Sequence, residues 1–553
     1  MDELLSPVFI PCASRVSYEP EDPSYTERVM PSTSRKTDED WIKKVRDRVK
    51  SACPVHHADK PCTIFKVPEH IRQLAPKAYE PVIASLGPFH HHLYASCVIT
   101  DHKWRCVWHL LSRHESQEYA DKLLDECLME LKERDAEVRN CYSEVLPRRL
   151  DAQNLALIML LDGCFIIYLM LKMHARIESS REQVKKDQEQ DDTVGKLEDK
   201  TGKEGEDKKM KECTTEAGQG ELVLTIDQEK EKLPPDPTVA GLFTLDLVIH
   251  DLLKLENQIP FDIIQLLFDK LKPCEDEKID LVDLALQLFK DIHPNESKSF
   301  KKKSPREYHH LLHLFHSSRI TSEKLVKSKW KKAEVASSQG STQGTLTSAP
   351  KWIPSAIELG RCGVKFKRKE PADNFLDITF EWRKIKVTPL FCLLKLWLMF
   401  RSGRMEIPPL QIYDYTDALF RNLIAFEQCY FDTEMYITIY ALFMDCIIDQ
   451  AEDVRLLHLE DILEHKLSND QAVAELFNKL GCQIRFTWKK NYLTNQIMKI
   501  NNFCDSRWHK WLAALRRDYL GNPWAIISVL AAFILLLLTT EQAVFSALSY
   551  HHS

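Results

Sequence analysis

The chain has 553 residues, of which 44% are hydrophobic and 28% are charged, and its formal net charge at pH 7 is −7. This length gives material for several domains, and the net charge gives no general electrostatic reason to bind nucleic acid. Only 15 residues are glycine, which disfavours turn-rich β folds and glycine-rich phosphate loops. The 16 cysteines include no C-x-x-C pair, so zinc-ribbon spacing is absent and we expect mostly reduced thiols.

The N-terminal half is predicted to hold an arm, a helical part and a charged insertion. Residues 1–40 mix Ser, Thr, Pro and charge without apolar periodicity, which predicts a disordered arm. Residues 41–176 show helical spacing and form the first helical part of the body. Within it, residues 154–173 are strongly apolar, but Asp162 interrupts the run, so we expect a buried core helix. The charge-rich range 177–240 predicts a disordered insertion.

The C-terminal half is predicted to contain two further parts of the body. Apolar positions recur at helical spacing in residues 241–335, which predicts a second helical part. Residues 336–352 form a linker rich in Ser, Thr and Gly. Residues 353–518 form a third, helical part with short strands, including strand candidates at 376–380 and 405–412 that could pair as a hairpin. The predicted fold class is therefore mostly α, a helix-rich two-lobed body with a few short strands.

The end of the chain predicts one transmembrane helix at 519–545, followed by a short tail at 546–553. No charged residue occurs from Leu520 to Thr540. At about 1.5 Å per helical residue, this stretch matches a hydrocarbon core of about 30 Å. The alternative is a buried core helix of a soluble domain. The residues that we expect to contact lipid are Trp524, Ala525, Ile526, Ile527, Val529, Leu530, Phe533, Ile534, Leu535 and Leu538.

The charges beside this segment predict its orientation. Arg507, Lys510, Arg516 and Arg517 precede it, whereas the tail after Glu541 carries no Lys or Arg. The positive-inside rule therefore places the N-terminal body in the cytosol, as in a tail-anchored protein. The acidic, proline-broken N-terminus does not resemble a secretory signal. We expect the plasma membrane, with the endoplasmic reticulum as the alternative because the span is short.

Several phrases occur together in one order. They are VPEHIRQLAPKAYEPVIASLGPFHH at 67–91, MLLDGCFIIYL from 159, DLLKLENQIPF from 251, EIPPLQIYD from 406, RNLIAFEQ from 421 and NPWAIIS from 522. With these phrases the chain resembles the plant domain-of-unknown-function 247 family, also called uncharacterised protein family 0481. The resemblance implies a plant protein with a helix-rich body, one C-terminal membrane helix and no established enzymatic activity. It also implies roles in recognition, including self-incompatibility, and in stress or defence. Residues 381–402 depart from the family pattern, as an unspliced intron or a lineage insertion would.

Seven polar residues in apolar helical surroundings are predicted to be structural. Unpaired burial costs a few kcal/mol, so we expect each to be hydrogen-bonded, with Arg139 or Arg421 and the backbone before Pro260 as partners. The alternative is that Glu256 or a cysteine such as Cys164 serves a membrane-tethered hydrolase. The seven residues are Asp162, Glu256, Asn257, Gln258, Arg421, Glu427 and Gln428.

Histidines at 309, 313 and 316 share one helical face, and this spacing is compatible with a metal site. We favour an amphipathic helix with solvated histidines, and we predict no metal, cofactor or catalytic residue. The predicted function is a single-pass, membrane-anchored plant protein that acts in protein interaction or recognition. The expected partners are the lipid bilayer and other proteins, not nucleic acid. The residue pattern specifies no oligomeric state.

Overall fold

The structure is a computed structural model that describes residues 33–52, 62–91, 97–114, 116–147, 150–198, 245–272, 279–320, 352–382, 403–484, 491–505 and 523–552. It divides into two compact units, Met1–Asp59 and Lys60–Ser553. The predicted linker at 336–352 lies outside the described residues except for Trp352. The atypical insertion at 381–402 also lies outside them, except for Glu381 and Trp382.

The first unit contributes the helix α1 (Thr33–Ala52). This helix begins inside the range 1–40, for which the sequence predicts a disordered arm; the remainder of that range lies outside the described residues. Charged residues dominate the segment and its apolar positions are few, so its composition alone did not predict a helix. Those apolar positions nevertheless recur one helical turn apart, at Trp41, Val45 and Val49.

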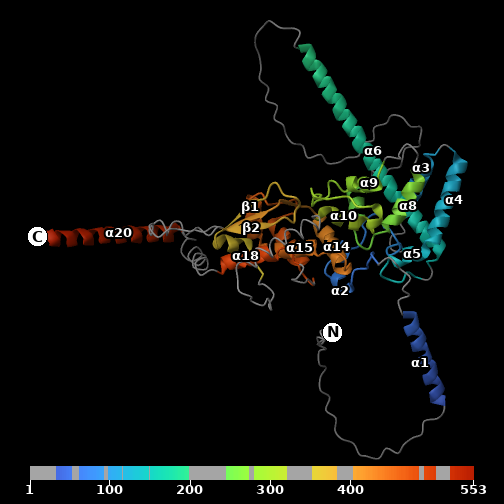
Figure 1. The fold of residues 1–553 in the computed structure, drawn as a ribbon, viewed down its shortest axis with the longest axis horizontal. Helices are drawn as coiled ribbons and strands as arrows, with labels where there is room; N and C mark the ends of the chain where they lie inside the picture. Colours follow the sequence, from blue (N-terminus) through green and yellow to red (C-terminus); the bar gives the residue numbers. More distant parts are fainter. Residues whose placement is uncertain are drawn as a thin grey trace, which may run out of the picture. The chain divides into compact units, whose positions relative to one another are not determined.

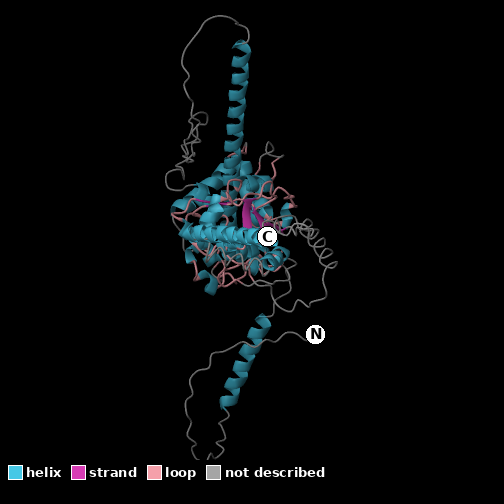
Figure 2. Cartoon of the chain, turned by 90° about the vertical axis from the view of Figure 1, so that its left-hand side faces the viewer, coloured by secondary structure: helices cyan, strands magenta, loops and turns pink. Residues whose placement is uncertain are grey.

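Helices predominate in the second unit, and strands are few (Figures 1 and 2). In its first half, α6 (Ala152–Glu198) packs against α3 (Cys97–Leu111), α4 (Gln117–Glu133), α8 (Phe261–Leu271) and α9 (Leu281–Leu288). Since these helices cover several sides of α6, its apolar residues are buried in the core. The shorter elements here are α2 (Glu69–Arg72), η1 (Pro76–Ala78), α5 (Asp135–Asn140), α7 (Leu245–Asp251), η4 (Pro305–Glu307) and α10 (Leu311–Arg319).

The helix α6 confirms one expectation and differs from another. Among the described residues, its segment Ala152–Lys185 is long and apolar enough to span a membrane, but most of that segment is buried inside the protein. The predicted core helix at 154–173 is therefore confirmed. The helix then continues to Glu198 through residues expected to be disordered. Glu, Lys, Arg and Gln favour helix, and Arg181 Nη1 pairs with Glu178 Oε1 at 2.6 Å on the helix surface.

The second half of this unit forms helices near 417–428, 434–450 and 469–479, as the apolar periodicity of the sequence in those ranges predicts. The side chain of Asn469 begins the last of these by accepting a hydrogen bond from the Ala472 amide at 2.8 Å. The helices here are α12 (Ala356–Arg361), α14 (Thr416–Cys429), α15 (Tyr436–Ile447), α16 (Ala451–Leu459), α17 (Asp470–Leu480) and α18 (Thr494–Cys504).

The strands form two small sheets. β1 (Val364–Arg368), β3 (Gly403–Ile407) and β2 (Thr379–Trp382) lie in that order, with β3 parallel to β1 and antiparallel to β2. The antiparallel pairing confirms the contact expected between the segments at 376–380 and 405–412. The second sheet pairs β4 (Leu410–Ile412) with β5 (Leu463–His465) in parallel.

The predicted single strand at 405–412 is in fact two strands in different sheets. Pro408 and Pro409 separate β3 from β4, and proline cannot donate a backbone hydrogen bond to a sheet ladder. Neither β1 nor β5 was predicted, because β5 has only three residues and β1 has only two apolar positions, Val364 and Phe366.

The expectation of a two-lobed body is wrong, because residues from Lys60 onward form one compact unit. Buried hydrogen bonds join the two halves of the sequence. Asn422 Oδ1 accepts from the Leu255 amide at 2.9 Å, and Asn422 Nδ2 donates to the Ala78 carbonyl at 2.8 Å. The linker-like composition between the halves predicted two lobes, but composition carries no information on contacts between the halves.

The helix α20 (Pro523–His552) covers most of the predicted transmembrane range and continues through the predicted tail. Its described apolar stretch, Ala531–Ser546, is shorter than a full membrane span. Of the expected lipid-contacting side chains, the described ones are each more than half exposed: Ile527, Phe533, Ile534, Leu535 and Leu538. The side chains of the others lie outside the described residues: Trp524, Ala525, Ile526, Val529 and Leu530.

Candidate functional site

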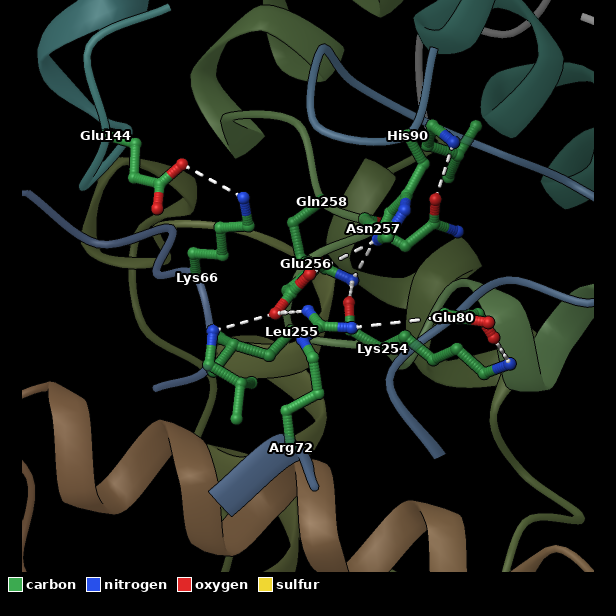
Figure 3. A network of polar contacts seen from close by, with 12 residues as sticks. Lys66, Arg72, Glu80, His90, Glu144, Lys254, Leu255, Glu256, Asn257 and Gln258 are labelled. Atoms are coloured by element: carbon green, nitrogen blue, oxygen red, sulfur yellow. Dashed lines mark hydrogen bonds and ion pairs between the residues drawn. The ribbon is translucent and has the colours of Figure 1, made fainter. Parts of the chain in front are cut away.

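The loop between α7 and α8 carries the polar residues predicted at 256–258, and every residue from Asp251 to Pro260 is buried. Loops usually run over the surface, because buried backbone groups need hydrogen-bond partners. In this protein, side chains of the loop and of the segment 62–91 supply those partners (Figure 3). The arrangement joins two segments that lie far apart in the sequence.

Asp251 holds the segment 82–84 against this loop. Its Oδ1 accepts from the Val82 amide at 2.8 Å, and its Oδ2 accepts from the amides of Ile83 at 2.7 Å and Ala84 at 2.9 Å. Lys254 Nζ lies 2.9 Å from Asp251 Oδ1 and balances the charge. A fully buried carboxylate with these partners is a structural anchor. Asp251 was not among the polar residues predicted from the sequence, although its position in DLLKLENQ offered the same signal as Glu256.

Glu256 binds Arg72 rather than the predicted Arg139 or Arg421. Its Oε1 accepts from Arg72 Nη2 and from the Val67 amide at 2.7 Å, and its Oε2 lies 3.4 Å from His90 Nε2 (Figure 3). Burial disfavours the charged carboxylate, but the contacts with His90, Val67 and Arg72 outweigh it and lower the pKa of Glu256. Glu256 is therefore an ionised, paired carboxylate, which differs from the protonated acid that a buried general acid requires.

Asn257 and Gln258 satisfy the backbone of the buried loop. Asn257 Oδ1 accepts from the Leu86 amide at 2.6 Å, and its Nδ2 donates to the Ala84 carbonyl at 2.8 Å. Gln258 Nε2 donates to the Leu252 carbonyl at 2.7 Å, while Gln258 Oε1 accepts from the Leu312 amide at 3.1 Å. The expectation that backbone groups near Pro260 pair with these side chains agrees with these contacts.

Asp162 lies in the middle of α6 and contacts Lys103 on α3. Its Oδ1 is 2.5 Å from Lys103 Nζ, which also donates to the Ser85 carbonyl at 2.6 Å. Its Oδ2 accepts from the Gly87 amide at 2.7 Å. Gly87 has φ +63°, and a Cβ there would lie 2.6 Å from the Gln258 carbonyl oxygen, so the turn requires glycine. The charge in the core helix therefore fixes the segment 85–87.

A second buried carboxylate, Glu427 at the end of α14, lies beside the first turn of α15. Its Oε1 accepts from His316 Nε2 at 2.8 Å and from the Ile437 amide at 2.9 Å. Its Oε2 accepts from the Thr438 amide at 2.8 Å and the Thr438 hydroxyl at 2.6 Å. Amides in a first helical turn have no partner within the helix, so Glu427 acts as a cap supplied by another helix.

The predicted solvated histidines are in fact packed against α14. His310 and His316 are buried, and His310 Nε2 contacts the Thr63 carbonyl at 3.1 Å while its Nδ1 accepts from the His313 amide at 3.2 Å. Burial, with a smaller effect of His309, lowers the pKa of His310 to about 3, and burial lowers the pKa of His313 well below its usual value. Sequence spacing predicted the shared face of His309, His313 and His316, but not that α14 and Tyr430 cover it.

The remaining two predicted polar residues, Arg421 and Gln428, lie along α14. Arg421 Nε donates to both carboxylate oxygens of Asp417 at 3.0 Å, one turn away on the same helix. Both Arg421 and Gln428 line a mainly apolar pocket together with Tyr79 and Cys482. Gln428 Nε2 lies 3.9 Å from Met435 Sδ.

Metal binding and cysteine catalysis can each be compared with the described side chains. Within the described ranges, no three or more His, Cys, Asp and Glu side chains are grouped so that they could hold a metal ion. Burial raises the pKa of Cys164 well above its usual value, and the nearby Cys127 and Cys106 act in the same direction. A thiol in such a place stays protonated, whereas the nucleophile of cysteine catalysis is the thiolate.

A family model described as a plant protein of unknown function, DUF247, matches residues 64–538. The chain belongs to this family. The DUF247 match spans the buried loop, α14 and α20 as far as residue 538, so the buried carboxylates described above lie inside the family region. This confirms the resemblance inferred from the sequence.

Curated relatives support the same assignment. UPF0481 protein At3g47200 of Arabidopsis thaliana is 26% identical over 497 residues, which cover 88% of this chain and 87% of the relative. A second Arabidopsis UPF0481 protein, At3g02645, is 30% identical over 190 residues, or 34% of this chain and 32% of the relative. No solved structure matches this DUF247 protein.

Proposed function

We propose that this DUF247 protein is anchored in a membrane by α20 and acts through protein interaction rather than catalysis. The observation that carries the proposal is the exposure of large apolar side chains on α20, for example Phe533 at 59% and Leu535 at 62%. Exposed apolar area of this kind is costly in water but favourable in lipid. From Pro523 to Thr540 the uncharged helix is about 27 Å long, close to a hydrocarbon core of about 30 Å.

Two threonines near the end of the uncharged stretch suit a lipid environment. The Thr539 hydroxyl donates to the Leu535 carbonyl at 2.9 Å, and the Thr540 hydroxyl donates to the Leu536 carbonyl at 2.9 Å. Such internal hydrogen bonds satisfy polar groups where no water is present. The basic residues before α20 and the lack of Lys and Arg in residues 541–553 favour a cytosolic body. We place the anchor in the plasma membrane, with the endoplasmic reticulum as the alternative.

The use of the buried carboxylates supports a role without chemistry. Asp251, Glu256 and Glu427 each bind backbone amides of another segment, as the contacts above describe. A general base needs a free lone pair directed at a substrate. Asp251 and Glu427, which have both carboxylate oxygens on backbone amides, hold the fold together and leave recognition to the exposed surface.

An exposed aromatic pair on α3 is the surface that we propose for a protein partner. Trp104 and Trp108 lie one turn apart and are 46% and 51% exposed, with the exposed Arg105 between them. Tryptophan and arginine are enriched among residues that dominate binding energy at protein interfaces. Through this contact the protein would act in recognition during self-incompatibility, stress or defence, as the family resemblance implies. The double variant W104A/W108A should lose copurifying partners that wild type and the exposed-site control V145A retain.

The anchor is tested by placing one charge inside α20. A charged residue near the middle of a span costs about 2.5 to 3.5 kcal/mol on insertion scales, so L535R should weaken membrane association, measured by flotation of the full chain. Leu459 is 74% exposed in the body, and L459R is the matched control that should float like wild type. Equal flotation of all three proteins would show that α20 is not what holds the chain on the membrane.

A further inference from the structure

The helix α1 has an apolar face that is exposed in the part of its unit that the structure describes. Trp41 and Val49 are each 65% exposed, and Ile42 and Val45 are 44% and 45% exposed. At about 100° per residue, these four positions form one stripe about 100° wide along the helix. A stripe of large exposed apolar side chains on an otherwise charged helix is typical of an interaction surface.

Basic residues border the stripe on both sides. With the same helical spacing, the exposed Arg46 and Lys43 lie on one side of the stripe, and the exposed Lys44 lies on the other. Asp47 falls on the side opposite the apolar positions. The sequence from Trp41 to Ala52 is therefore strongly basic, although the whole chain has a net charge of −7.

We infer that α1 lies in the surface of an anionic membrane, with its apolar stripe among the lipid tails and its basic flanks on lipid headgroups. The arrangement matches an interfacial helix, in which Lys and Arg flank a face of Trp and aliphatic residues. Tryptophan favours the boundary between headgroups and tails. A protein groove that bound this helix would need acidic residues at specific positions beside an apolar channel. A layer of anionic lipid headgroups instead meets basic residues on both sides of the stripe without such placement. The inference extends the proposed function, because it gives the anchored chain a second, lipid-selective contact.

The test measures amide hydrogen exchange of the full chain, inserted into vesicles of phosphatidylcholine alone or phosphatidylcholine with phosphatidylserine. Amides of residues 41–52 should exchange slowly only when phosphatidylserine is present, and high salt should remove this protection. Each Lys or Arg near an anionic surface strengthens binding about fivefold, so K43E/K44E should reduce the protected population about 25-fold or more. V45D should abolish protection by interrupting the stripe.

The control is K365E/K367E, which makes the same charge change at two exposed lysines on β1 and should leave α1 protected. Rapid exchange of α1 in both kinds of vesicle would overturn the inference. Protection in both kinds that K43E/K44E does not change would also overturn it, because protein rather than lipid would then cover the stripe. Exchange of α20, read in the same samples, reports separately on the proposed anchor.

Discussion

Removal of the Glu427 carboxylate should destabilise the body strongly. In E427A, the amides of Ile437 and Thr438 and the Thr438 hydroxyl lose their acceptor while remaining buried. An unsatisfied buried donor costs about 1 to 3 kcal/mol, so these three groups predict a loss of at least about 3 kcal/mol. His316 also loses its contact at 2.8 Å. E427Q keeps the shape and one acceptor oxygen, and should lie between wild type and E427A.

The assay is denaturant unfolding of the full chain, and the quantity compared is the denaturant concentration at the midpoint of unfolding of the body. The control is E144Q, which removes an exposed ion pair in which Glu144 Oε2 lies 3.1 Å from Lys66 Nζ. Exposed pairs contribute about 0 to 1 kcal/mol, so E144Q should unfold almost like wild type. If E427A unfolds no more easily than E144Q, Glu427 does not cap α15 as described, and the structural role assigned to the buried carboxylates is wrong.

Three other predictions follow from the buried groups. The pKa of His310, about 3, lies below the ordinary value of 6.5, so between these pH values the unfolded chain binds more protons than the folded chain. The free energy of unfolding should therefore fall as the pH drops below about 6.5. This fall should be less steep in the variant H310Q than in the control variant H70Q. An unchanged slope in H310Q would contradict the neutral, buried imidazole. D251A should speed amide exchange at residues 82–84, and unchanged exchange there would refute the anchor role of Asp251. Iodoacetamide should label the exposed Cys482 well before Cys164, and rapid native labelling of Cys164 would reopen the hydrolase hypothesis.

The sequence predicted where polar groups would be buried better than it predicted their partners. Asp162 and Glu256 stand out because each interrupts an apolar helical pattern, and an unpaired charge there would be costly. Their partners, Lys103 and Arg72, come from other parts of the chain, and helical spacing carries no information on such pairs. Asp251 shows the same limit, because its role depends on three consecutive amides of a loop.

Secondary structure was predictable where one periodicity dominates. The stripe at Val473, Leu476 and Phe477 predicted α17, and all three side chains are buried. Short elements such as β5 and the charged continuation of α6 were missed. A three-residue strand has almost no pattern of its own, and a charged helix differs little in composition from a disordered segment.

Protease protection in sealed membranes tests the central claim most directly. The full chain, tagged at Met1 and at Ser553, is treated with protease before and after the membranes are opened with detergent. A cytosolic body anchored by α20 predicts loss of the N-terminal tag and survival of the C-terminal tag until detergent is added. Protection of the N-terminal tag, or loss of both tags from intact membranes, would contradict the account.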